Sequence, residues 1–197
     1  MTFSLCILGF FAAGIAAGLF GVVPEAWSAD DLALIALYVL LVFVGMGVGS
    51  DSRSLSHILK VRGKVVLVPL GIAVGSLMGA GVVALFLPGL NFREGMAVGA
   101  GFGYYSLSSI LISQMHSQDL GVIALLSNII REVITLVGVS LFIRLGPLGP
   151  IASGGATAMD TTLPLISRYI PGEYTVIAVF SGLVLSLLVP LLIPMIL

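Results

Sequence analysis

The chain has 197 residues, of which 59% are hydrophobic and 9% are charged, and its formal net charge is −1. A soluble domain carries about a quarter charged residues, so this composition excludes a soluble enzyme and predicts a membrane protein. A net charge close to zero gives no reason to expect a nucleic-acid partner.

Apolar runs recur along the whole chain, which predicts a single all-α, polytopic transmembrane domain over residues 1–197. A spanning helix needs about 20 apolar residues. We expect six such helices, in chain order, over 3–22, 32–49, 65–87, 94–113, 120–143 and 174–196. A seventh crossing, over 153–169, is shorter and discontinuous, because glycine and proline interrupt it.

Segment 51–64 is the most basic part of the chain and predicts its orientation. Four basic residues oppose Asp51 there: Arg53, Lys60, Arg62 and Lys64. The positive-inside rule places this loop in the cytoplasm. Seven crossings then put the N-terminus in the cytoplasm and the C-terminus outside the plasma (inner) membrane. Residues 53–60 form either a short interfacial helix or an ordinary basic loop.

Two of the expected crossings are poorly suited to a plain helix. The first, 94–113, has glycines at 95, 99, 101 and 103 in its first half. These glycines either pack closely against a neighbouring helix or break the helix that contains them. In the second, 153–169, Gly154, Gly155 and Pro164 surround a run of hydroxyl side chains. Pro164 lacks a backbone donor, and we expect the helix break in this segment.

Arg131 and Glu132 lie side by side at the centre of the apolar run 120–143. Each is about 18 Å from either end of its helix, which is too far to snorkel to water. Adjacent helical residues point about 100° apart, so each needs a partner from elsewhere. Asn128 extends the polar face. Arg131 either binds substrate or fixes helix packing, through Asp160 or the carbonyls of a broken helix, whereas Glu132 is predicted to bind a cation or carry a proton.

Asp160 is the second carboxylate expected at membrane depth. Freed carbonyls and helix ends at an interrupted helix can bind cations, so we expect a site where Asp160 is joined by Thr157, Thr161 and Thr162. The alternative is a helix N-cap, in which the carboxylate accepts from the amide of Thr162 or Leu163. No metal site and no cofactor are predicted, apart from a coupling H⁺ or Na⁺.

The sequence contains no hydrolase, nucleotide-binding or metalloprotease motif, so we do not expect an enzyme. An intramembrane aspartyl protease that used Asp160 would need a second deep aspartate. None of the remaining aspartates lies deep in an expected span: Asp30, Asp31, Asp51 and Asp119. A structural membrane subunit, in which Arg131 and Asp160 only dock helices, stays open as a second alternative.

Three blocks of the sequence resemble the LysO family of bacterial and archaeal lysine exporters. They are "GFGYYSLSS" at 101–109, "LLSNIIRE" at 125–132 and "GGATAMDTTLP" at 154–164, and together with "VFVGMGVG" in the second span they cover most of the chain. The resemblance implies export of L-lysine, or of a similar cationic amino acid, in exchange for protons or sodium. A carrier of another organic solute, or a cation/proton antiporter, would share this architecture.

The family looks related to cation:proton antiporters and bile-acid symporters, which have two inverted five-helix repeats with a broken fourth helix in each. This implies that residues 1–50 end the first repeat and that 64–197 form the complete second repeat. Typical members extend further at the N-terminus by about three crossings. A separate small membrane subunit, or a second copy of the chain, is therefore an expected partner.

These expectations combine into a predicted site for a cationic amino acid. Glu132 and Asp160 would bind the substrate ammonium or the coupling cation. Arg131 would hold the substrate carboxylate or keep one of the two acids ionised. Five side chains would complete the hydrogen-bonding lining: Asn128, Tyr105, Ser106, Thr157 and Thr162.

Overall fold

The computed structural model describes residues 63–197 and, before them, only the isolated positions 16, 17, 35, 39 and 42. Apart from those positions, the expected spans 3–22 and 32–49 and the segment 53–60 lie outside the described residues. The elements below all belong to the compact unit Phe43–Leu197.

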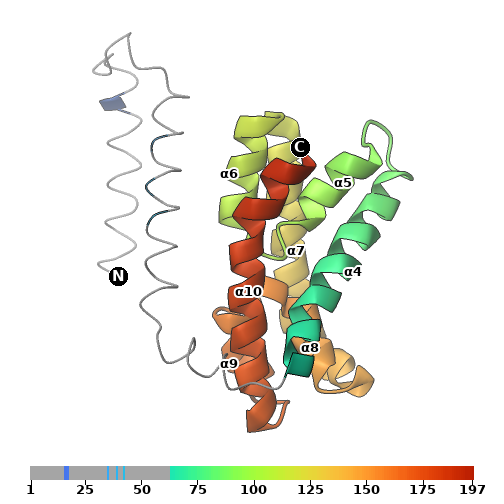
Figure 1. Cartoon of the computed structure of the whole chain (residues 1–197), viewed down its shortest axis with the longest axis vertical. Helices are drawn as coiled ribbons and strands as arrows, with labels where there is room; N and C mark the ends of the chain where they lie inside the picture. The colour runs from blue at the N-terminus through green and yellow to red at the C-terminus, as the bar shows by residue number, and fades with distance from the viewer. Residues whose placement is uncertain (1–15, 18–34, 36–38, 40–41, 43–62) are drawn as a thin grey trace. The chain divides into compact units, whose positions relative to one another are not determined.

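The described unit is helical (Figure 1). Its α-helices are α4 (Leu67–Ala84), α5 (Phe92–Gly99), α6 (Tyr105–Met115), α7 (Gln118–Phe142), α8 (Leu148–Gly154), α9 (Leu163–Ile166) and α10 (Gly172–Ile196). Short 3₁₀ helices adjoin α4, α7 and α8 at η1 (Gly63–Val66), η2 (Ile143–Leu145) and η3 (Gly155–Met159).

Within residues 63–197, α4, α7 and α10 are the three helices that are long and apolar enough to cross a membrane. They confirm the helices expected over 65–87, 120–143 and 174–196. With 25 residues each, α7 and α10 are about 37 Å long at 1.5 Å per residue. Only 22% of the most apolar window of α7 is buried, so most of its apolar surface suits contact with lipid.

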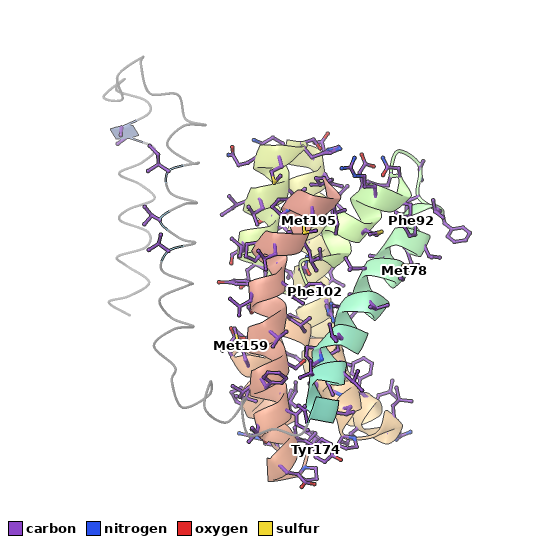
Figure 2. The ribbon with its side chains drawn as sticks, viewed as in Figure 1. Met78, Phe92, Phe102, Met159, Tyr174 and Met195 are labelled. Atoms are coloured by element: carbon purple, nitrogen blue, oxygen red, sulfur yellow. The ribbon has the colours of Figure 1, made fainter. Side chains whose placement is uncertain are left out.

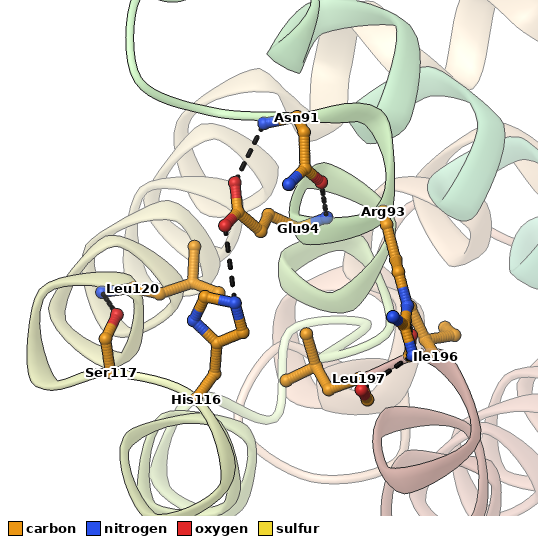
Figure 3. Close-up of polar contacts among 8 residues, drawn as sticks. All are labelled: Asn91, Arg93, Glu94, His116, Ser117, Leu120, Ile196 and Leu197. Carbon is orange, nitrogen blue, oxygen red and sulfur yellow. Dashed lines mark hydrogen bonds and ion pairs between the residues drawn. The ribbon is translucent and has the colours of Figure 1, made fainter.

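Segment 94–113 is not one helix but two short ones, α5 and α6, of 8 and 11 residues. Glu94, in the first turn of α5, pairs through Oε1 with Nε2 of His116, the residue that ends α6, at 3.3 Å (Figure 3). The start of α5 therefore lies beside the end of α6. The segment is a helical hairpin, the α5–α6 hairpin (residues 92–115), in place of the single crossing that the sequence predicted.

The same end of the bundle holds the last residues of α10. The Arg93 guanidinium donates to the main-chain oxygen of Ile196 and, at 2.6 Å, to that of Leu197 (Figure 3). Because α7 begins two residues after His116, α7 starts at the end where α10 stops, and these two long helices are antiparallel. We call this the first end of the bundle and the opposite one, where α7 stops and α10 begins, the second end.

The segment between α7 and α10 must therefore leave and return at the second end. It forms the α8–α9 hairpin (residues 148–166). Its helix is interrupted, as the sequence predicted for 153–169, but the segment does not cross the bundle. Figure 2 shows the two ends: Phe92 and Met195 lie at the first, Tyr174 lies at the second, and Phe102 and Met159 lie between them. The two hairpins thus enter from opposite ends and meet in the middle.

Packing against α10 confirms the depth of the second hairpin. Gly182 is near the midpoint of α10, and a Cβ added to it would lie 2.7 Å from the Cβ of Met159 and 2.8 Å from the carbonyl oxygen of Ala156. Only glycine allows this approach, because real Cβ atoms do not come so close to other atoms. The turn of the α8–α9 hairpin is therefore held at half the length of α10.

Local sequence explains how the α5–α6 hairpin forms. Asn91 and Glu94 make a capping box at the start of α5, with reciprocal side chain to backbone hydrogen bonds of 2.8 and 2.9 Å. Gly99 faces α4, where an added Cβ would lie 2.6 Å from the Ser76 carbonyl oxygen and 2.7 Å from Ala80 Cβ. The glycines of this segment therefore serve both roles that the sequence left open: Gly99 packs against α4, and the break follows it directly.

The breaks themselves fall at residues with positive φ. The first turn contains Phe102 at φ 50° and Gly103 at φ 100°, and the second contains Gly155 at φ 62°. Such angles favour glycine, and the buried Phe102 must be held there by its surroundings. Pro164 does not cause the second break, because it lies in the first turn of α9, where a missing N–H is tolerated.

Candidate functional site

The two hairpin turns bind one another directly. The Ala156 amide, in η3, donates to the carbonyl oxygen of Phe102 at 2.8 Å. A Cβ on Gly155 would fall on that same oxygen, and one on Gly103 would lie 3.1 Å from the Gly154 carbonyl oxygen. Two backbone segments more than 50 residues apart in the chain thus meet at a point where neither Gly103 nor Gly155 could carry a side chain without strain.

Asn128 on α7 holds the turn of the α5–α6 hairpin. Its Oδ1 accepts from the Gly103 amide at 2.7 Å, and its Nδ2 donates to the carbonyl oxygens of Ala124 at 2.8 Å and Val98 at 3.4 Å. The side chain is 4% exposed. Both of its polar atoms are engaged by backbone groups, so Asn128 stabilises the break.

Arg131 binds the end of α8. Its Nε donates to the Ser153 carbonyl oxygen and its Nη2 to that of Ala152, both at 2.9 Å, while Nη1 donates to Ser76 Oγ on α4 at 3.0 Å. The two carbonyls belong to the last turn of α8, where backbone acceptors lack helical partners and the helix dipole is negative. Of the alternatives left open by the sequence, the structure shows the carbonyls of a broken helix, and Arg131 joins α4, α7 and α8.

Glu132 lies beside Arg131 in the chain but not in its network. Its side chain is partly exposed on α7, and among residues 63–197 it makes no hydrogen bond or ion pair. The 100° step between successive helical residues explains the separation. Its carboxylate is thus available to an ion or to a group outside the described residues.

Asp160 lies just after η3 and borders a small cavity. Its Oδ1 accepts from the Thr161 amide at 2.5 Å, so the predicted N-cap to Thr162 or Leu163 is not formed. The cavity has a volume of about 50 Å³. It is lined by residues of both hairpins and of α10: Tyr104, Ala156, Thr157, Met159, Asp160 and Ser186.

Thr157 and Thr162 shape the wall that carries Asp160. Thr157 Oγ1 donates to the Gly154 carbonyl oxygen at 3.0 Å, and Thr162 Oγ1 donates to that of Thr157 at 3.0 Å. Both side chains are buried, whereas Thr161 is exposed. The threonines therefore fix the turn after Gly155, and Thr157 also faces the cavity.

The structure brings only part of the predicted site together. Thr157 and Asp160 line the cavity, but Glu132, Tyr105 and Ser106 do not. Tyr104 takes the place expected for Tyr105, and Ser186 was missed entirely. Ser186 gives only a weak signal in the sequence, as one of few polar residues in the last apolar run.

A larger groove lies elsewhere on the unit. It has a volume of about 600 Å³ and runs between α4 and α8, with Ser76 as its one polar side chain. Arg131 already binds Ser76, and none of the described residues that line the groove is ionisable. Because a charged or zwitterionic ligand needs polar partners, the small cavity at Asp160 is the better candidate site. In the part of the chain that the structure describes, no group of acidic, histidine or cysteine side chains could hold a metal ion.

Comparisons with known proteins point to one family. The sequence model of the family described as "Lysine exporter LysO" matches residues 8–197. The lysine exporter LysO of Escherichia coli (strain K12) is 34% identical over 193 residues, which are 96% of this chain and 62% of that protein. A Haemophilus influenzae (strain Rd) protein named "Putative lysine exporter" is 34% identical over 159 residues, 81% of this chain and 80% of that protein. No solved structure matches the chain.

Proposed function

Because this chain belongs to the lysine exporter LysO family, we propose that it exports L-lysine, or a similar cationic amino acid, as a secondary transporter or as the larger part of one. The chain is a multi-pass membrane protein, and it spans 62% of the length of its E. coli relative. The proposed substrate is taken from the names of the two relatives. One observation supports the mechanism: two broken helices meet at mid-depth beside the Asp160 cavity.

The proposed transport site is built around Asp160. A carboxylate beside interrupted helices, with hydroxyl groups and freed carbonyls nearby, is suited to bind an ammonium group or a coupling cation. Competition between lysine and H⁺ or Na⁺ for this carboxylate would couple their movements. Glu132 is proposed as a second cation-binding group, on a different face of α7 from Arg131. Arg131, with its three donors engaged, is proposed to set the position of α8 and not to hold the substrate carboxylate.

We propose that residues 63–197 cross the membrane three times and re-enter it twice, in place of the five crossings expected from hydropathy. The second end of the bundle would be cytoplasmic. It carries Arg144 and Arg168 against Glu173, whereas the first end carries Arg93 against Glu94 and Asp119, so the excess of positive charge lies at the second end. The C-terminus then lies outside, as the sequence predicted, because three and five are both odd.

The arrangement also supports an inverted repeat of a different kind from the one expected. The helix α4 is followed by a hairpin from the first end, and α7, which runs the opposite way, is followed by a hairpin from the second end. We propose that α4 with α5–α6 and α7 with α8–α9 are two inverted units. Secondary transporters commonly place their substrate site where such units meet.

A partner is proposed for the part of the relatives that this chain does not cover. A separate small membrane subunit would supply it, and a second copy of the chain is the alternative partner. Purification of the full chain in mild detergent tests this proposal. Co-purification of a second membrane protein, or a stable dimer, is expected; a monomer with full export activity would refute it.

The proposed function is tested by lysine flux in proteoliposomes that contain the full chain and whatever membrane protein co-purifies with it. Asp160→Asn should abolish flux driven by a pH or Na⁺ gradient, because the neutral amide cannot exchange one cation for another. Glu173→Gln, which neutralises an exposed carboxylate in the first turn of α10, is the matched control and should transport normally. Normal lysine flux by the Asp160→Asn protein would overturn the proposal.

A further inference from the structure

We propose that the cavity between Asp160 and Ser186 binds the primary ammonium group of the transported amino acid, and that the Ser186 hydroxyl makes this site select an ammonium over a guanidinium. This inference rests on the proposed export function and assigns a part of it to a residue on α10.

Two serines of α10, Ser181 and Ser186, have buried hydroxyl groups that find no hydrogen-bond partner among the described residues. Their exposed fractions are 0% and 1%. A hydroxyl inside a helix ordinarily donates to the carbonyl four residues earlier, as Thr135 does to Arg131 and Ser108 does to Tyr104, each at 2.9 Å. Leaving a buried hydroxyl unpaired is unfavourable, so its retention calls for a ligand or another role.

Only one of the two serines lines the cavity beside Asp160. Ser186 lines the cavity that Asp160 borders, while Ser181 does not. The cavity therefore presents an unpaired hydroxyl from α10, a carboxylate from the turn after η3, and the hydroxyl-bearing residues Tyr104 and Thr157. These groups come from both hairpins and from a long helix, which is how a site is assembled at the meeting point of separate elements.

The volume of the cavity limits what it can hold. About 50 Å³ is enough for one or two groups of the size of water, because a water molecule occupies about 30 Å³ in the liquid. A whole amino acid does not fit, but a terminal ammonium does. A guanidinium has four heavy atoms in a rigid plane and fits this small space less readily than an ammonium does.

The chemistry of the lining also matches an ammonium. A primary ammonium has three donors and no acceptor. Asp160 supplies a charged acceptor, Ser186 supplies an unpaired one, and Tyr104 or Thr157 can supply the third. A guanidinium has five donors in a planar fork, and a cavity of this size would leave several of them unpaired. An analogue with mismatched donors is rejected strongly by such a site.

The test is substrate selectivity of Ser186→Ala, with Ser181→Ala as the matched control. Both variants remove an unpaired buried hydroxyl from α10, so both should fold and keep or gain thermal stability in detergent. In proteoliposomes, Ser186→Ala should raise the KM for lysine about tenfold or more, since a hydrogen bond to a charged group is lost. Excess arginine should inhibit lysine transport by Ser186→Ala more strongly than it inhibits wild-type transport, when each is compared with inhibition by ornithine. Ser181→Ala should match the wild type in both.

The outcomes separate this inference from the proposed function. Loss of flux in Asp160→Asn combined with unchanged KM and selectivity in Ser186→Ala would overturn the ammonium site and leave export intact. A change in Na⁺ dependence without a change in lysine KM would also overturn it, since the cavity would then hold the coupling ion. If Asp160→Asn transports lysine normally, the export mechanism fails first.

Discussion

The two hairpins have similar shapes but very different polar chemistry. The turn of the α5–α6 hairpin is closed: Asn128 satisfies the Gly103 amide, and the buried Phe102 offers its carbonyl to Ala156. The turn of the α8–α9 hairpin has Asp160 with a single backbone partner and a cavity beside it. The polar groups named in the first turn are thus paired within the protein, whereas the second turn keeps an acidic group available to a ligand.

The two charged positions that look most functional in the sequence differ in the same way. Arg131 uses three donors on fixed acceptors, whereas Asp160 accepts one hydrogen bond within the described residues. A partly buried arginine with each of its three nitrogens bonded to a fixed acceptor stabilises a fold, because moving it would leave carbonyls unpaired. A carboxylate with free lone pairs can exchange ligands. Unused hydrogen-bonding capacity, and not depth in the bundle, is therefore the feature that distinguishes Asp160 from Arg131.

The largest expected effect comes from Gly155→Ala, at the contact between the hairpins. The new Cβ would fall on the Phe102 carbonyl oxygen and would be held at φ 62°. We expect a loss of stability of about 3 kcal/mol or more, seen as a lower unfolding temperature or as aggregation in detergent. Gly75→Ala, on α4, has no atom within 4 Å of the new Cβ and should leave stability unchanged. A stable Gly155→Ala protein would show that the turns do not touch.

The next effect in size is that of Arg131→Met. Removal of the guanidinium leaves the carbonyls of Ala152 and Ser153 without their donors, and we expect about 3 kcal/mol of destabilisation. Glu132→Gln, at the adjacent position, should change stability by less than about 0.5 kcal/mol but should impair flux. Unfolding temperature and flux, measured on both variants, test whether Arg131 stabilises the fold and Glu132 takes part in transport. Equal destabilisation by both would contradict it.

Asn128→Leu tests the closed turn separately. The Gly103 amide would lose its acceptor in a buried place, which costs about 1–3 kcal/mol. Ser127→Ala, one residue earlier and exposed, is the control and should have no effect. Chemical denaturation in mixed detergent micelles would measure both. If Asn128→Leu lost transport at unchanged stability, Asn128 would belong to the site and not to the support.

The smallest effect is expected at the first end of the bundle. His116→Ala removes one partner of a partly exposed ion pair and should cost less than about 1 kcal/mol. Glu94→Ala should cost about 1 kcal/mol more, because Glu94 also closes the capping box with Asn91. The difference between the two unfolding temperatures measures the cap. Identical temperatures would mean that the cap does not contribute.

The long helices could be predicted from the sequence because an uninterrupted apolar run is itself the signal. The ends of α4, α7 and α10 lie within three residues of their predicted ends. The hairpins could not be predicted in this way. Helices of 8 and 11 residues joined by a short turn have nearly the same total length as one crossing, and hydropathy does not record a reversal of direction.

The site was predictable only where a residue carries charge or interrupts a helix. Asp160 and the glycines before it were found for those reasons. The partner of Arg131 was left open because a guanidinium donates hydrogen bonds both to carboxylates and to main-chain carbonyls. Ser186 was missed because a single hydroxyl in an apolar helix has no pattern; only the three-dimensional packing shows that its hydrogen bond is unused.

Accessibility of single cysteines tests the opposed hairpins most directly. In a Cys6→Ser background, cysteines at Asn91 and Ser117 flank the α5–α6 hairpin, and cysteines at the exposed Leu145 and at Gly172 flank the α8–α9 hairpin. With an impermeant thiol reagent on intact cells, the first pair should both react from outside. The second pair should react only once the reagent reaches the cytoplasm. If the two members of either pair react from opposite sides, that segment crosses the membrane and the account fails.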